Sequence, residues 1–270
     1  MAYTTINKST DYFNTLIYTG NGSSPRSITG VGFRPDLVWT KDRSDSSTQP
    51  WHDVVRGATY AIRSDSTVIN TNTAAYGYIT SFDSDGYTFQ QGSSDIGRFN
   101  DNSNLYVSWN WKAGNSQGSS NTDGSINTTY TSVNTTAGFS ISQYTGTGAN
   151  ATVGHGLGVA PSMIIIKNLG ATQGWCVYHN KNTSAPETDF LSLNSTDATV
   201  DAADRWNDTA PTSSVFSVGT HADTNGSSAT YIAYCFAEKI GYSKFGSYTG
   251  NGSLDGTFIY TGFKPAWGVF

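Results

Sequence analysis

The sequence is poor in several residue types, and each shortage excludes a class of protein. Glutamate occurs twice and leucine eight times in 270 residues, so the strong helix formers that a helical bundle needs are scarce. Charged residues make up 13% of the chain, about half of the usual share. Two cysteines are too few for a disulfide scaffold or a cysteine-rich zinc module.

The charge balance and the short hydrophobic runs limit the partners. A net charge of −5 argues against nucleic-acid binding, because that function needs a basic surface to neutralise phosphates. No apolar run approaches the roughly 20 residues that span a bilayer. Residues 1–8 lack the apolar core and the cleavage site of a secretory signal peptide. We therefore expect no nucleic acid, no membrane insertion and no secretion by such a signal.

The residues that are abundant favour β-structure. Serine and threonine together number 70, aromatic residues make up 13% of the chain, and valine and isoleucine are plentiful. Glycine, with 29 residues, supplies turns. Disordered segments are depleted in aromatic and β-branched residues. The composition therefore predicts a folded, all-β protein.

Three stretches of the chain share the same landmarks. Each stretch contains a Tyr-Thr-Gly sequence, and a proline follows its tyrosine after 17 residues. The tyrosines are Tyr18, Tyr144 and Tyr248, and the prolines are Pro35, Pro161 and Pro265. For both landmarks the first two copies are 126 residues apart and the next two 104. Such constant spacing indicates an internal repeat.

The repeat predicts the domain organisation. Each copy contains several short alternating or apolar runs separated by turn residues, which is typical of a β-sandwich. We predict two tandem jelly-roll or lectin-like β-sandwich domains, at 1–114 and 139–244. Residues 115–138, rich in serine, threonine, asparagine and glycine, are expected to form a flexible linker. Residues 245–270 are expected to form a β-hairpin that begins a third repeat.

The partial third copy has two interpretations. Either the chain is a fragment of a longer repeat protein, or the hairpin completes the second sandwich or pairs with the edge of a neighbouring subunit. We favour a paired hairpin, because an unpaired apolar strand promotes aggregation. The residues expected at this assembly edge are Phe258, Tyr260, Phe263 and Trp267.

Several segments resemble those of known proteins. They are residues 2–6, 18–22, 32–39, 53–59, 81–87 and 106–114. With these segments the chain resembles repeat-containing virion structural and tail-fibre-like proteins of marine and environmental tailed phages. The resemblance implies a lectin-like β-sandwich and a place on the virion surface after synthesis in the host cytoplasm. It implies no catalytic residue.

The predicted function is therefore that of a non-enzymatic phage structural protein. It would serve host-surface glycan adhesion as a tail fibre, or decorate the capsid. The expected partners are copies of the chain itself, as a trimer or a filament, other virion proteins and a host glycan. The alternatives are an extracellular filament subunit assembled by strand exchange and a polysaccharide depolymerase.

Aromatic residues in polar surroundings are the candidates for glycan contact. Trp51, His52 and Trp206 are the residues chosen on this basis, because aromatic rings stack on sugars. The other tryptophans that the repeat places where a core needs bulk are Trp39, Trp109, Trp111 and Trp267. His52 and Asp53 form the only local His–Asp pair, but neighbours on a strand point to opposite faces. They are therefore not expected to act together in a catalytic triad.

Acidic turns give a weak calcium hypothesis. Asp83, Asp85 and Asp223 lie in Asp- and Asn-rich turns that resemble the first half of a calcium loop. They lack the carboxylate that an EF-hand has at position 12, so turn chemistry is the main interpretation. We expect no cofactor and no confident metal site.

The two cysteines lie in predicted strands of the second copy. Cys176 and Cys235 have no cysteine counterpart in the first copy. Buried free thiols and a disulfide bond both remain open.

Overall fold

The computed structural model describes residues 4–71, 75–93 and 98–269, and strands dominate it. The helical elements of the described residues are three short turns: η1 (Ser9–Asp11), η2 (Pro186–Thr188) and α1 (Ala203–Trp206). The strand pairs of the named sheets are antiparallel. The predicted all-β class is confirmed.

The first unit contains a large and a small sheet. The large sheet has the order β1-β8-β3-β4-β5, and the small sheet has the order β2-β7-β6. The strands of the large sheet are β1 (Phe13–Thr19), β3 (Leu37–Asp42), β4 (Pro50–Asp53), β5 (Ile62–Arg63) and β8 (Leu105–Trp111). Those of the small sheet are β2 (Arg26–Thr29), β6 (Tyr78–Asp83) and β7 (Gly86–Gln90).

The second unit repeats this plan with additional edge strands. Its large sheet has the order β15-β14-β13-β12-β17-β10-β9, and β11 pairs with β16 in a small sheet. The strands of the large sheet are β9 (Tyr130–Asn134), β10 (Phe139–Thr145), β12 (Met163–Asn168), β13 (Trp175–His179), β14 (Asp189–Ser192), β15 (Val200–Asp201) and β17 (Thr230–Phe236). The small sheet consists of β11 (Ala151–Gly154) and β16 (Val215–Val218).

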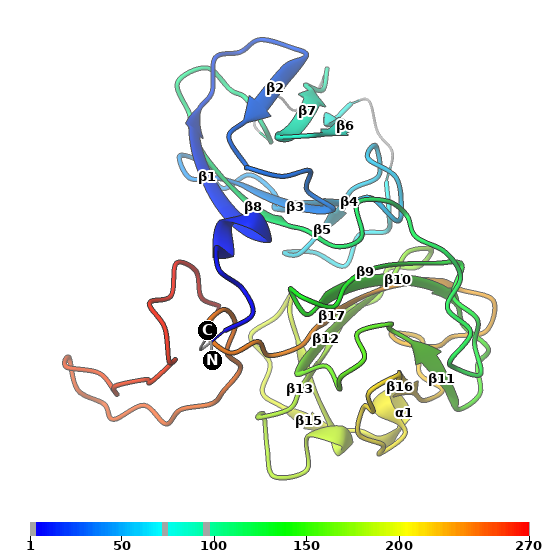
Figure 1. Ribbon diagram of the computed structural model, residues 1–270. Helices are drawn as coiled ribbons and strands as arrows, with labels where there is room; N and C mark the ends of the chain where they lie inside the picture. The colour runs from blue at the N-terminus through cyan, green and yellow to red at the C-terminus, as the bar shows by residue number, and fades with distance from the viewer. Residues whose placement is uncertain (1–3, 72–74, 94–97, 270) are drawn as a thin grey trace.

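The four main sheets lie in four layers, with the two large sheets in the middle (Figure 1). Each layer boundary contains a hydrophobic core. One core joins the two sheets of the first unit, and another joins those of the second. The third core lies between the two large sheets and is built from both units, including Leu37, Trp51, Trp111, Phe139, Trp175 and Tyr234. The two units therefore share a core.

The tyrosine landmarks occupy matching positions in the two large sheets. Tyr18 on β1 is opposite Tyr106 on β8, and Tyr144 on β10 is opposite Tyr231 on β17. Each pair of rings is stacked, with centroids 5.1 Å apart in the first unit and 5.2 Å in the second. In both units, the hydroxyl of the first tyrosine donates to a backbone carbonyl of a distant loop.

The loop after the landmark tyrosine is held in the same way in both units. A buried asparagine, Asn100 or Asn225, lies beside it. Its Oδ1 accepts the backbone N–H of Asn21 in the first unit, at 3.0 Å, and of Thr147 in the second, at 2.8 Å. Its Nδ2 donates to the carbonyl two residues further along the loop. The Tyr-Thr-Gly loops are therefore fixed from inside the fold.

The prolines of the first two copies also have equivalent positions. Leu37 and Met163 each follow their proline, Pro35 or Pro161, by two residues, and each pairs with the last residue of the central strand, β8 or β17. Proline lacks the N–H that a ladder needs. Its place just before the strand therefore leaves the ladder intact.

Residues 115–138 do not form the flexible linker that their composition predicts. They include β9, which pairs with β10 over five residues. Before β9, Ile126 is buried and forms a parallel bridge with Val153. This segment is therefore part of the second unit, because backbone pairing outweighs its polar composition.

The predicted C-terminal hairpin is wrong for the residues that the structure describes. Residues 245–269 contain no strand and form an extended loop, drawn in orange to red at the side of the molecule (Figure 1). Tyr248 and Pro265 lie in this loop, so the third pair of landmarks has no sheet around it. Short runs such as residues 257–260 need a partner strand to become ordered, and no described strand is beside them.

The residues expected at the assembly edge lie in the same loop. Phe258 is 87% exposed and Tyr260 76%, and Phe263 is half-buried. Trp267 packs against the first unit, with its ring centroid 5.4 Å from that of Trp111 and 5.7 Å from that of Phe13. These residues therefore form no strand edge, and one of them extends the shared aromatic core.

Candidate ligand site between the two units

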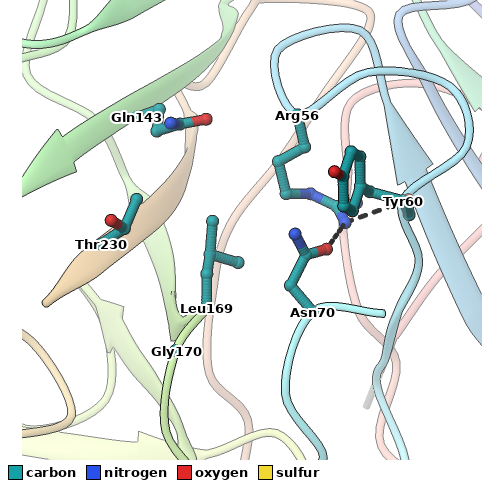
Figure 2. A pocket seen from close by; sticks show the side chains of 7 residues that line it. All are labelled: Arg56, Tyr60, Asn70, Gln143, Leu169, Gly170 and Thr230. Atoms are coloured by element: carbon teal, nitrogen blue, oxygen red, sulfur yellow. Dashed lines mark hydrogen bonds between the residues drawn. The ribbon is translucent and has the colours of Figure 1, made fainter. Parts of the chain in front are cut away.

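A cavity of about 390 Å³ lies where the two units meet. Its volume is within the range of small-molecule sites, roughly 300–1,000 Å³. Both units contribute to it, as Figure 2 shows. Its lining residues are Arg56, Tyr60 and Asn70 from the first unit and Gln143, Leu169, Gly170 and Thr230 from the second.

Arg56 forms the wall of the cavity in the first unit. Its Nη1 donates to the carbonyl oxygen of Tyr60 at 3.1 Å and to Oδ1 of Asn70 at 2.8 Å (Figure 2). Its Nη2 donates to the carbonyl oxygen of Trp51 at 2.9 Å. The guanidinium is planar and has five donors in fixed directions. These bonds therefore fix the loop between β4 and β5 and the segment after β5 in one arrangement.

A buried ion pair keeps Arg56 charged. Its Nε lies 2.5 Å from Oδ2 of Asp53, and both side chains are almost fully buried. Burial opposes the charge, but the Asp53 carboxylate and the Tyr234 hydroxyl outweigh it and raise the pKa of Arg56. The hydroxyl of Tyr234, from the second unit, donates to the same Oδ2 at 2.6 Å. The wall of the cavity is therefore coupled to the second unit.

The side chains of the second unit bring unused polar groups to the cavity. Among the described residues, no hydrogen bond engages the side-chain amide of Gln143 or the hydroxyl of Thr230. The ring of Tyr60 is partly exposed on the opposite wall. An aromatic ring with nearby amide and hydroxyl groups can stack on one face of a sugar and hydrogen-bond its hydroxyls. The cavity therefore has the chemistry of a neutral polar-ligand site.

The predicted glycan contacts are wrong, because all three residues are buried. Trp51 and Trp206 are each 2% exposed and His52 is fully buried. Trp51 lies in the shared core, with its ring centroid 5.2 Å from that of Trp175. Trp206, on α1, packs in the core of the second unit. Polar neighbours in the sequence indicated a surface position, but facing sheets cover these rings.

His52 and Asp53 point to opposite faces of β4, as expected for neighbours on a strand. His52 faces the core of the first unit, where its ring centroid is 5.6 Å from that of Phe99. Within the described part of the chain, neither ring nitrogen of His52 has a hydrogen-bond partner. Asp53 faces the second unit and binds Tyr234. The two side chains therefore do not act together.

The calcium candidates bind donors of the protein itself. Asp83 accepts hydroxyl hydrogen bonds from two residues of its own hairpin. Asp85 accepts two backbone N–H groups of the connection between β2 and β3, at 3.0 and 2.6 Å. Asp223 Oδ2 lies 3.3 Å from Nη2 of Arg205. These carboxylates therefore stabilise turns and loops.

Both cysteines are free and buried in the second unit. Cys176 is on β13 and Cys235 on β17, and β12 lies between these strands. Strands two places apart are separated by roughly 9.5 Å, which is too far for a disulfide bond. Of the two open interpretations, buried free thiols are confirmed.

Within residues 4–71, 75–93 and 98–269, no group of three or more histidine, cysteine, aspartate or glutamate residues is arranged to hold a metal ion. No helix in the same ranges combines the length and the apolar character needed to cross a membrane.

No pattern in the sequence indicates the cavity. Arg56 lies in one of the segments that carry the phage resemblance, but its neighbours across the cavity are far away in the chain. Gln143 and Thr230 come from β10 and β17 of the other unit. Only the relative placement of the two units brings these residues together, and no local pattern encodes that placement.

Two facing sandwich units with a polar cavity at their junction define an all-β repeat protein with a ligand-sized site. The chain belongs to the family described as Domain of unknown function (DUF7483), whose model matches residues 8–270. Comparison with curated proteins gives no match, and comparison with solved structures gives none.

Proposed function

We propose that this chain is a non-enzymatic structural protein of a phage particle and that it binds a surface glycan in the cavity between its units. The observation that carries the glycan part is the set of lining groups: one exposed ring and unused amide and hydroxyl groups. The virion part is supported by the resemblance of the repeat to tail-fibre-like proteins.

The rigidity of the cavity supports binding rather than large movement. Arg56 has protein partners for all three of its nitrogens, and Asp53 links it to Tyr234. A site that is ordered before binding loses little conformational entropy when the ligand arrives. A glycan repeat on a host surface, present in many copies, compensates for weak affinity at each site.

A glycan array with matched variants tests this proposal. Gln143→Ala and Tyr60→Ala each remove one lining group, and we expect each to weaken glycan binding about tenfold, the equivalent of one lost hydrogen bond or ring contact. Gln90→Ala, at an exposed position outside the cavity, is the control. Equal binding by all variants, or no binding by the native chain, would contradict the glycan proposal.

Two readouts separate adhesion from the alternative functions. Release of shorter sugar products during binding would favour a depolymerase. Labelling of the chain in purified particles, by antibody and electron microscopy, tests the virion location. Capsid labelling would assign decoration, and labelling at the tail would assign adhesion.

A further inference from the structure

The two large sheets differ at one edge. In the second unit, β9 covers β10, and residues 139–143 pair with residues 134–130. In the first unit β1 is the terminal strand, and no described strand pairs with its outer edge. Edge strands with unpaired N–H and C=O groups are templates for a further strand.

The side chains of β1 show the same difference. Phe139 on β10 is 2% exposed, whereas the equivalent Phe13 on β1 is only half-buried. Ile17, which corresponds to Gln143, is 66% exposed. Charged residues usually protect open edges from pairing with another strand, and an exposed isoleucine gives no such protection. The outer edge of β1 therefore has the apolar side chains expected of a strand that is paired on both sides, although no described strand pairs with it.

The sequence contains a counterpart of β9 in front of β1. Residues 131–134, within β9, read Thr-Ser-Val-Asn, and residues 4–7 read Thr-Thr-Ile-Asn. Each segment ends a few residues before the phenylalanine that starts the next strand. Residues 4–7 are nevertheless not a strand in the structure, although Ile6 is buried.

A single residue explains why this segment does not fold back onto its own β1. Gly138 and Tyr12 are equivalent, because the carbonyl of each accepts the N–H of the residue that follows the central strand. Gly138 has φ +70°, and its N–H donates to the carbonyl of Asn134 to close the β9–β10 turn. Tyr12 has φ −129° and ends η1. A tyrosine adopts a positive φ only at a cost, so the turn of the second unit is not available here.

We propose that the free edge of β1 binds residues 4–7 of a second copy of this chain, as an antiparallel strand in the register of β9. Thr5 of one copy then lies opposite Thr15 of the other, and Ile6 lies opposite Asn14. Ile6 leaves its present site and is buried again beside the other copy. Because donor and acceptor are neighbours in the chain, two copies exchange these segments reciprocally and form a closed, two-fold dimer.

The pairing is independent of ligand binding in the cavity. A monomeric variant can still bind glycan, and a dimer can form without any glycan. The failure of one proposal is therefore distinguishable from the failure of the other.

Cysteine cross-linking of the full chain tests the register. Thr5→Cys and Thr15→Cys variants are mixed and oxidised, and we expect a disulfide-linked dimer that contains one copy of each. Thr5→Cys mixed with Thr29→Cys is the control, because Thr29 is exposed but lies on β2. The proposal would be overturned if the mixture forms no disulfide bridge, or if a Thr5→Cys/Thr15→Cys double variant forms disulfide bridges only within single chains.

Two further variants test the donor and the turn by light scattering and sedimentation. Deletion of residues 1–7 is expected to raise the dimer dissociation constant at least tenfold. Tyr12→Gly restores the glycine of the second unit and is expected to shift the chain towards monomer by letting the segment fold back. A dimer that survives the deletion but is lost on removal of residues 245–270 would assign the donor to the C-terminal loop and overturn the proposal, as would a native chain that is monomeric at all concentrations.

Discussion

The hydroxyl of Tyr234 donates a 2.6 Å hydrogen bond to Asp53, and this bond joins the central strand of the second unit to the buried ion pair of the first. Both side chains are fully buried. The same carboxylate oxygen accepts from Arg56, which forms one wall of the cavity. The contact therefore links the stability of the pair of units to the geometry of the candidate site.

Tyr234→Phe is expected to destabilise the whole chain. The substitution keeps the ring in the shared core and removes one hydrogen bond to a charged acceptor, at a cost of about 1.5–3 kcal/mol. Urea unfolding followed by tryptophan fluorescence measures the change. Tyr60→Phe, at a partly exposed ring, serves as the control and is expected to change the free energy of unfolding little. Equal effects of the two variants would contradict this assignment.

The two buried asparagines are expected to contribute equally to their units. Asn100→Ala and Asn225→Ala each remove a side chain that both donates to and accepts from the loop after the landmark tyrosine. Leaving such buried backbone groups without partners costs about 2–5 kcal/mol in each case. Asn102→Ala, at an exposed position, is the matched control. A large loss of stability in one variant and none in the other would show that the two loops are held differently.

The repeated modules can be predicted from the sequence, but the contact between the two units cannot. Tyr18 and Tyr144 are recognisable because each module needs the same ring at the same place in its sheet. The predicted surface position of Trp51 is wrong because its burial depends on a facing sheet more than 100 residues away, through Trp175 and Tyr234. The predicted C-terminal hairpin is wrong for a related reason, since a pattern such as residues 257–260 becomes a strand only beside a partner strand.

Acid is expected to destabilise the fold through His52. Burial, reinforced by Arg56 and Arg98, lowers the pKa of His52 well below its usual value of about 6.5. The unfolded chain then binds a proton that the folded chain does not bind. The stability from neutral His52 is complete above about pH 6.5 and is lost progressively as the pH falls below that value.

The experiment compares wild-type protein with His52→Gln by urea unfolding between pH 7.5 and 4.5. Asp36 acts in the opposite direction, because burial raises its pKa to about 6, and its ionisation therefore weakens the fold as the pH rises towards 6. Asp36 is present in both proteins, so its contribution cancels in the difference. A difference in stability that does not change with pH would refute the role of His52.

Both thiols are expected to be unreactive in the folded chain. Burial raises the pKa of Cys235 to about 12 and that of Cys176 well above its usual value, so neither forms the reactive thiolate near neutral pH. A chromogenic disulfide reagent should therefore titrate two thiols only after urea is added. Rapid reaction of either thiol in native buffer would contradict the burial of β13 and β17.

The tryptophan-rich face shared by the large sheets has a consequence for how such proteins can change. The first unit alone would expose Trp51 and Trp111 to water, and the second alone would expose Trp175 and Tyr234, each as part of a large hydrophobic patch. Neither half can then be excised, grafted or exchanged with a relative unless the opposite face is altered to match. Although the sequence consists of repeated modules, the smallest part that can be transferred to another protein is the pair of units that face each other.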